Sequence, residues 1–278
     1  MNRRQLLAED LRVAPLRLGP WLRSLSATGA YELLSEAELR ATRRSETVFI
    51  FGSGSSLNDV SPQGWQAIGR HDTLGFNWFV HETFVRCDYH LIRGIPDDDL
   101  DEAVWRPQLE EYFAALRANP RFADTIFLVH GGFRAINGNR AIGLRYLPGG
   151  SRIFRWRSNK LVATPTMSFA EGLAHGESTL MECVNFASLL GWRRIVLAGV
   201  DLYDRRYFWL AGEETRSIDT GRGATAADRH ARAESGMIDT LRAWRSWLGD
   251  RDVELFVYDR RSLLAGPLPV YEPSAPAA

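Results

Sequence analysis

Two segments that lie far apart in the chain each place glycine beside polar side chains directly after an apolar run. The first follows Val48–Phe51 and consists of Gly52, Ser53, Gly54, Ser55 and Ser56. The second consists of Gly199, Val200, Asp201, Leu202 and Tyr203. Glycine adopts backbone angles that bulkier residues avoid, and serine hydroxyls with backbone amides can bind a phosphate or a sugar hydroxyl. If both apolar runs are strands of one parallel sheet, the two segments form a single nucleotide-dependent site at its carboxyl edge.

A run of three acids, Asp97–Asp99, suggests a different chemistry. Adjacent carboxylates can bind Mg²⁺ or Mn²⁺. These acids also lie beside a predicted helix start, where negative charge favours the helix dipole. We favour the second interpretation and predict no metal site. Cys87 and Cys183 lie in separate apolar runs, so they offer neither metal-ligand spacing nor a disulfide framework.

Strands alternate with helices along most of the chain. We predict strands at 48–51, 73–77, 89–92, 125–130, 194–199 and 253–258. Helices are predicted from 62 onward and over 101–118, 177–190 and 233–248. Residues 131–166, rich in glycine and arginine, are expected to be irregular. This alternation predicts an α/β fold with a doubly wound, mostly parallel, Rossmann-like sheet.

The sequence divides into an N-terminal helical extension (1–46), one Rossmann-like domain (47–268) and a disordered tail (269–278). Within the domain, residues 204–232 have little core-forming content, which is typical of a disordered segment or a lid. The extension is basic and amphipathic. It could contact an anionic membrane surface, or pack on the main domain or on a second subunit in a homo-oligomer; we favour packing.

Composition limits the function classes. The chain has 278 residues, 45% of them hydrophobic, with a net charge of zero. This suits one large α/β domain or two small ones, and gives no global attraction for nucleic acid. Neither a signal peptide nor a membrane-spanning run is evident, so we expect a cytoplasmic protein.

The order of several short motifs resembles one enzyme family. The motifs are Gly52-Ser-Gly-Ser-Ser-Leu57, Phe76-Asn77-Trp78, Ser178-Thr179, Gly199-Val-Asp-Leu-Tyr203, Tyr207, His230 and Ser262-Leu-Leu-Ala265. Over roughly residues 47–268 they resemble the bacterial sialyltransferases of glycosyltransferase family 42 and the related Maf-type flagellin glycosyltransferases. The family's first turn reads Gly-Asn-Gly-Pro-Ser-Leu, so Ser53 and Ser55 are departures. Arg93 falls near a nucleotide-binding asparagine of the family and is a third departure.

The resemblance implies a GT-A-like fold and a metal-independent, inverting enzyme without a cofactor. It would transfer a sialic acid-type or Kdo-type sugar from a CMP donor to a glycan acceptor such as a cell-surface polysaccharide. Tyr203 and Tyr207 would stabilise the departing phosphate, His230 would be the base, and residues 204–232 would close over the donor. Nucleotide contacts would come from Gly52, Ser53, Gly54, Ser55, Ser56, Asn77, Ser178, Thr179, Gly199 and Asp201. We add three candidates for binding phosphate or the sugar carboxylate: Arg93, Arg205 and Arg206.

Simpler interpretations remain open for the same residues. The first turn occurs in many α/β proteins, Asn77 could cap a helix, and the tyrosines could be packing residues. His230 lies in a polar run typical of a surface histidine, and His175 is the next candidate base. Alternative functions are an ATP- and Mg²⁺-dependent pyrophosphokinase-like enzyme on the same scaffold, and a non-catalytic nucleotide-binding protein.

Overall fold

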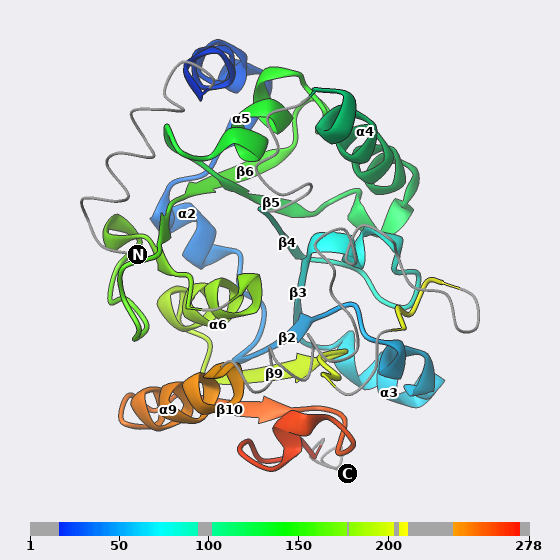
Figure 1. Ribbon diagram of the computed structural model, residues 1–278. Helices are drawn as coiled ribbons and strands as arrows, with labels where there is room; N and C mark the ends of the chain where they lie inside the picture. Colours follow the sequence, from blue (N-terminus) through cyan, green and yellow to red (C-terminus); the bar gives the residue numbers. More distant parts are fainter. Residues whose placement is uncertain (1–16, 94–101, 177, 203–205, 211–235, 273–278) are drawn as a thin grey trace.

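The computed structural model describes residues 17–93, 102–176, 178–202, 206–210 and 236–272, without the side chains of residues 102 and 104. It is an α/β structure built on an eight-stranded sheet (Figure 1). Among the helices in these ranges, none is long and apolar enough to cross a membrane.

Every pair of neighbouring strands in the central sheet is parallel. The strand order is β1-β6-β5-β4-β3-β2-β9-β10. The strands are β1 (Glu32–Leu33), β2 (Thr47–Phe51), β3 (Asp72–Phe76), β4 (Tyr89–Ile92), β5 (Ile126–His130), β6 (Arg152–Trp156), β9 (Arg194–Ala198) and β10 (Glu254–Val257). From β2 the chain builds the sheet outward through β3 to β6, and then returns to the other side of β2 with β9. The strand order therefore reverses between β2 and β9.

Helices cover both faces of this sheet (Figure 1). One face packs against α2 (Glu36–Ala41), α6 (Thr179–Leu190) and α9 (Ile238–Gly249). The other packs against α3 (Pro62–Ile68), α4 (Glu102–Ala118) and α5 (Ile136–Gly143). All residues of β2 and β3 are buried, as expected for central strands covered on both sides. The predicted doubly wound, mostly parallel Rossmann-like sheet is thus confirmed.

Short elements complete the described chain. Two-residue strands β7 (Ser158–Asn159) and β8 (Leu173–Ala174) form a separate small sheet. Single 3₁₀ turns are η1 (Thr28–Ala30), η2 (Ser55–Asp59), η3 (Asn77–His81), η4 (Pro120–Phe122), η5 (Phe169–Glu171) and η7 (Leu263–Ala265). Of these, η2 and η3 follow directly from the carboxyl ends of β2 and β3, where the candidate site residues cluster.

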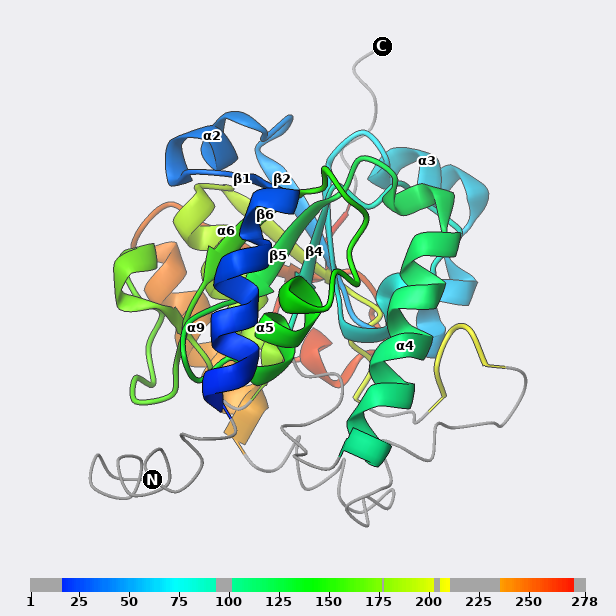
Figure 2. The same cartoon turned by 90° about the horizontal axis from the view of Figure 1, so that it is seen from above.

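The N-terminal segment is part of the main domain. Residues 17–27 form a helix that lies against α5, where the Ser24 hydroxyl donates to Asn139 Oδ1 at 3.1 Å (Figure 2). Strand β1 then pairs with β6 at the edge of the sheet. From the sequence we placed these residues in an N-terminal extension, because a two-residue strand is too short to give a periodic pattern. Three leucines of this helix stay exposed: Leu18, Leu22 and Leu25.

Residues 131–166 are more regular than the sequence indicates, since they contain α5, β6 and β7. Helix α5 buries Asn137, Asn139 and Arg140, so its sequence lacks an apolar stripe. The Arg140 guanidinium lies over the Trp105 ring at 3.8 Å, and Asn139 accepts a hydrogen bond from Arg155 at 2.7 Å. Buried polar side chains, some of which bond to partners outside the helix, hid α5 from sequence periodicity.

Candidate functional site

The two glycine-containing segments meet at the carboxyl ends of β2 and β9. The Gly54 amide donates to the Gly199 carbonyl at 2.8 Å, and the Ser56 amide donates to Asp201 Oδ2 at 3.0 Å. The Ser56 hydroxyl also donates to Asp201 Oδ1. We call Gly52–Ser56 together with Gly199–Asp201 the double turn. It lies where the strand order reverses, the place at which open α/β sheets bind their ligands.

Glycines make this close approach of two backbones sterically feasible. A Cβ atom on Gly52 would lie 2.3 Å from the Gly199 carbonyl oxygen, and one on Gly54 would lie 2.3 Å from Asp201 Oδ2. Gly199 has a φ of +64° and packs against the Leu57 side chain. These three glycines, predicted as nucleotide contacts, therefore also have a structural role in joining the turns.

Several amides of the first segment have intramolecular acceptors. The sequence led us to expect them to point at a ligand, but the Gly52 amide donates to Ala198 and those of Gly54 and Ser56 donate to the second segment. The buried Asp201 carboxylate likewise bonds within the double turn. Ser53 remains partly exposed at its surface. A ligand here would contact the outer surface of a preformed double turn.

Tyr207 and Phe208 lie against the first segment. Tyr207 forms an antiparallel bridge with Gly54, and the Phe208 amide donates to the Ser53 carbonyl at 3.2 Å. The Asn58 side chain donates to the Phe208 carbonyl at 3.0 Å, which fixes this segment to η2. The ring of Trp209 lies against that of Tyr207 at an interplanar angle of 37°, with centroids 4.6 Å apart. One predicted catalytic residue, Tyr207, is thus brought beside the predicted nucleotide turn.

Other predicted residues fall outside the described part of the chain. They are Tyr203, Arg205, His230, the acids Asp97–Asp99 and nearly all of the expected lid. Arg206 is described, and it is exposed next to Tyr207.

Backbone strain occurs at the same edge of the sheet. Asn77, directly after β3, has a φ of +50°, and Leu202, directly after the double turn, has a φ of +62°. Residues other than glycine rarely adopt this backbone conformation, and those that do tend to lie in functional sites. Asn77 Oδ1 is buried and has no hydrogen-bond partner among the described residues. It begins η3, so it is not the capping residue that precedes a helix.

Ser178 and Thr179 lie at the amino end of α6, and the C-terminal segment supports the second half of the double turn. Ser178 precedes α6, and its hydroxyl contacts Met237 Sδ at 3.6 Å, while Thr179 is the first helical residue. The Ser262 hydroxyl donates to the Val200 carbonyl at 2.6 Å, and the Leu263 amide donates to the Asp201 carbonyl at 3.3 Å. The Ser262–Ala265 motif therefore contacts the double turn from the C-terminal side.

Arg93, at the end of β4, is ion-paired. Its guanidinium lies 2.8 Å from Oε2 of Glu182, a fully buried residue of α6, and it also contacts the imidazole of His175. Glu182 Oε1 lies 3.3 Å from His175 Nδ1 and accepts a hydrogen bond from the Ser158 hydroxyl at 2.6 Å. We call Arg93, His175 and Glu182 the charged triad. Sequence reasoning missed Glu182, because a single glutamate in a helix is ordinarily expected to face solvent.

A second histidine lies beside the charged triad. His130 ends β5, and its ring packs on Trp156 of β6 with centroids 4.8 Å apart. Burial, and next the positive charge of Arg93, lower the pKa of His130 to about 3. The buried Trp156 Nε1 has no hydrogen-bond acceptor among the described residues. Three nitrogen-bearing rings and a guanidinium therefore lie near one another here. Arg93, His130 and Trp156 come from the carboxyl ends of β4, β5 and β6, and His175 comes from the segment after β8.

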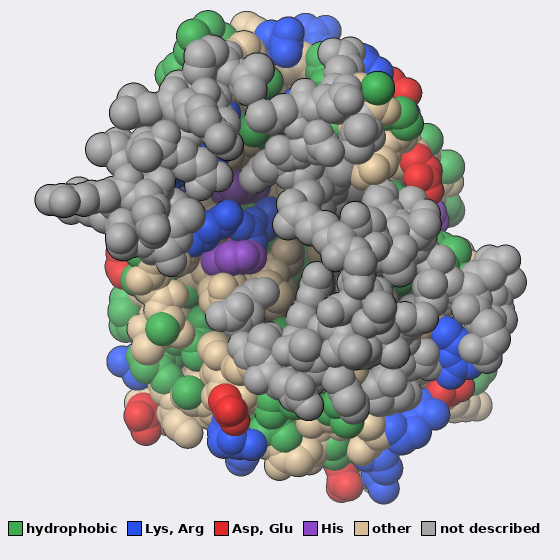
Figure 3. Space-filling model, in the orientation of Figure 1, with side chains coloured by type: hydrophobic (Ala, Val, Ile, Leu, Met, Phe, Trp, Pro, Cys, Tyr) green, Lys and Arg blue, Asp and Glu red, His purple; other side chains and the backbone are tan. Residues whose placement is uncertain are grey.

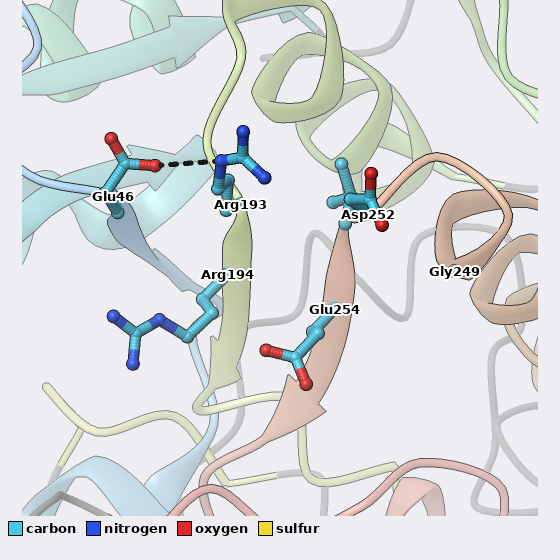
Figure 4. Close-up of a pocket in the computed structure, with 7 residues that line it drawn as sticks. Glu46, Arg193, Arg194, Gly249, Asp252 and Glu254 are labelled. Carbon is cyan, nitrogen blue, oxygen red and sulfur yellow. Dashed lines mark ion pairs between the residues drawn. The ribbon is translucent and has the colours of Figure 1, made fainter.

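A surface hollow of about 450 Å³ lies at the opposite edge of the sheet (Figure 4). It is lined by Glu46, Arg193, Arg194, Gly249, Asp252, Val253 and Glu254. Charges of both signs line it, and Arg193 is paired with Glu46 at 3.4 Å. Since parallel sheets bind ligands at the carboxyl ends of their strands, we do not take this hollow as the functional site.

Within the described ranges, no group of three or more His, Cys, Asp or Glu side chains is arranged to bind a metal. Comparison with models of protein families gave no match, and neither did comparison with curated protein sequences. The function must therefore be inferred from the motifs and the site geometry.

Proposed function

We propose that this chain is an inverting, metal-independent glycosyltransferase. It transfers a sialic acid-type or Kdo-type sugar from a CMP donor to a glycan acceptor. The observation that carries the proposal is the double turn: the two motifs that resemble family 42 sialyltransferases are hydrogen-bonded to each other where the strand order reverses. A ligand-binding site is expected at this place in a doubly wound sheet.

The position of Tyr207 gives further support. Its backbone bridges to Gly54, so Tyr207 lies beside the turn that a nucleotide would contact. In the proposed reaction the hydroxyls of Tyr203 and Tyr207 donate to the departing CMP phosphate and stabilise the charge that develops on it. Arg205 and Arg206 supply positive charge beside them.

The remaining roles follow the resemblance. His230 accepts the proton of the acceptor hydroxyl, since an imidazole with an ordinary pKa near 6.5 suits a base at neutral pH. Asn77, with its strained backbone and its unpaired Oδ1 in the described structure, contacts the cytidine or the sugar. The segment 204–232 closes over the donor and excludes water.

The test is slow hydrolysis of a panel of sugar nucleotides in the presence of a chelator. The panel contains CMP-sialic acid, CMP-Kdo, a UDP-sugar, a GDP-sugar and ATP. We expect CMP release from one CMP-sugar, and loss of that activity in His230→Ala. Turnover of ATP that requires Mg²⁺ would instead support the pyrophosphokinase-like alternative. Hydrolysis retained in His230→Ala would remove that residue from the role of base.

A further inference from the structure

A group of hydrogen-bond donors that the proposed chemistry does not use lies at the carboxyl ends of β4, β5 and β6 and in the segment after β8. Four described side chains make up this group: Arg93, His130, Trp156 and His175. In Figure 3, Lys or Arg side chains lie together with histidine side chains on this face, between the positions of α6 and β6 in Figure 1.

The charged triad is built to hold its cation in place. Glu182 is fully buried, yet it offers one carboxylate oxygen to Arg93 and the other to His175 and Ser158. The side chain of Arg93 keeps 11% of its surface exposed and that of His175 keeps 23%. Burying a charged pair is costly unless it is well bonded, and such pairs often fix a geometry. Glu182 therefore orients a guanidinium and an imidazole toward a surface that remains accessible.

Trp156 lacks a partner that the same surface could supply. Its Nε1 is a buried donor without an acceptor in the described structure, and the His130 ring, which is partly exposed, packs on the Trp156 ring. Unmet buried donors of this kind cost free energy and indicate a missing acceptor. The charges that act on His130 are those of Arg93, Lys160, His175 and Arg155, all basic. An oxyanion would supply both the acceptor and the compensating charge.

The distance between these side chains and the double turn indicates which part of the substrate they would contact. Neighbouring strands lie about 4.8 Å apart, so the end of β4 lies roughly 10 Å and that of β5 roughly 14 Å from the end of β2. A nucleotide on the double turn occupies the β2–β9 side of the edge. The four hydrogen-bonding side chains lie toward the β4–β6 side of the same edge. An acceptor sugar would approach a CMP-sugar bound at the double turn from that side.

We propose that Arg93, His130 and His175 form an oxyanion subsite that binds a carboxylate or phosphate group of an acidic acceptor. This assignment to the acceptor rests on the proposed function, whereas the anion subsite itself does not. Binding couples to proton uptake: the neutral His130 takes a proton from solvent when the anion arrives, and then donates to it. Affinity therefore rises as the pH falls, by up to about tenfold per pH unit while one proton is taken up.

The test follows the imidazole proton signals of the six histidines by NMR, with glucuronate or sulfate as the probe and with glucose and chloride as neutral and ionic-strength controls. We expect glucuronate and sulfate, but not the controls, to shift the signals of His130 and His175, more strongly at pH 5.5 than at pH 8. No selective shift of these two residues would overturn the subsite.

Variants separate binding from folding. His130→Phe keeps the ring on Trp156 and should weaken glucuronate binding about tenfold, read from His175. The double variant Arg93→Gln/Glu182→Gln removes both charges of the pair together and should abolish the shifts. The matched control is Arg86→Gln, which removes an exposed arginine paired with Asp88. Unchanged binding in His130→Phe and in the double variant would refute the assignment.

A second experiment distinguishes a subsite for the acceptor from a subsite for the sugar donor. With CMP at saturation, the glucuronate shifts should persist, because the two ligands occupy different parts of the edge. Displacement of glucuronate by CMP would overturn the acceptor assignment. Glucuronate binding in a protein that does not bind CMP would refute the proposed function and leave the anion subsite standing.

Discussion

Replacing the buried Glu82 by glutamine should stabilise the protein relative to wild type, by an amount that grows as the pH rises from 4.5 to about 7. Glu82 follows η3, and its Oε2 accepts hydrogen bonds from the Phe84 amide at 2.6 Å and the Val85 amide at 3.0 Å. Its Oε1 is buried and has no partner among the described residues. Burial raises the pKa of Glu82 from 4.5 to about 7, although those amides and the charge of Arg121 lower it.

The magnitude follows from linkage. Between pH 4.5 and about 7 the folded protein keeps a proton on Glu82 that the unfolded chain has released, so the free energy of unfolding falls as the pH rises. A pKa difference of about 2.5, at about 1.36 kcal/mol for each unit, corresponds to ~3 kcal/mol. Glutamine keeps an oxygen for both amides and has no proton to lose. The variant should therefore gain ~3 kcal/mol relative to wild type between pH 4.5 and pH 8.

Urea unfolding at pH 5, 6, 7 and 8, followed by tryptophan fluorescence, measures this difference. Burial lowers the pKa of His90 to about 3, so His90 makes the folded state less stable as the pH falls below 6.5. That effect is the same in both proteins and cancels in the comparison. The exposed Glu36→Gln serves as the matched control. A stability difference between Glu82→Gln and wild type that stays constant within about 0.5 kcal/mol from pH 5 to 8 would refute the reasoning.

Three further substitutions test the double turn, the proposed catalytic role of Tyr207 and the core. Gly54→Ala should cost ~1–3 kcal/mol in urea unfolding and weaken CMP binding, because its Cβ would lie 2.3 Å from Asp201 Oδ2; wild-type stability and affinity would contradict this role for the double turn. Tyr207→Phe should lower kcat for CMP-sugar hydrolysis by about 10²–10³. An unchanged kcat would make Tyr207 a packing residue. Trp192→Phe should cost ~1–3 kcal/mol in urea unfolding, because it removes the 2.8 Å hydrogen bond from Nε1 to the buried Asp72; a loss below about 0.5 kcal/mol would show that this bond contributes little.

The sequence predicts the central strands well and the outer elements poorly. Continuous apolar runs mark β2 and β9, because central parallel strands are buried on both faces. Strand β6 has arginine at its first and fourth positions, which breaks both an apolar run and a strict alternation, and β1 has only two residues, so neither gives a clear pattern. Helix α5 was hidden by buried polar side chains that bond to partners far along the chain.

The candidate site was likewise predictable from the sequence only in part. Glycine spacing after two apolar runs led to the double turn, because backbone proximity requires glycine locally. The charged triad was not predictable, since Arg93 and Glu182 are separated by 89 residues and only the fold brings β4 against α6. His175 drew attention only as an alternative base. Its contacts with Arg93 and Glu182 now give it a different proposed role.

The central claim is that the double turn binds the CMP moiety of a sugar donor. Calorimetric titration of CMP, with UMP, GMP and ATP as comparisons and a chelator present, tests it most directly. We predict that one CMP binds per chain, at least about tenfold more tightly than the other nucleotides, and that Gly54→Ala weakens this binding. Absence of CMP binding, or binding of ATP alone once Mg²⁺ is added, would contradict the claim.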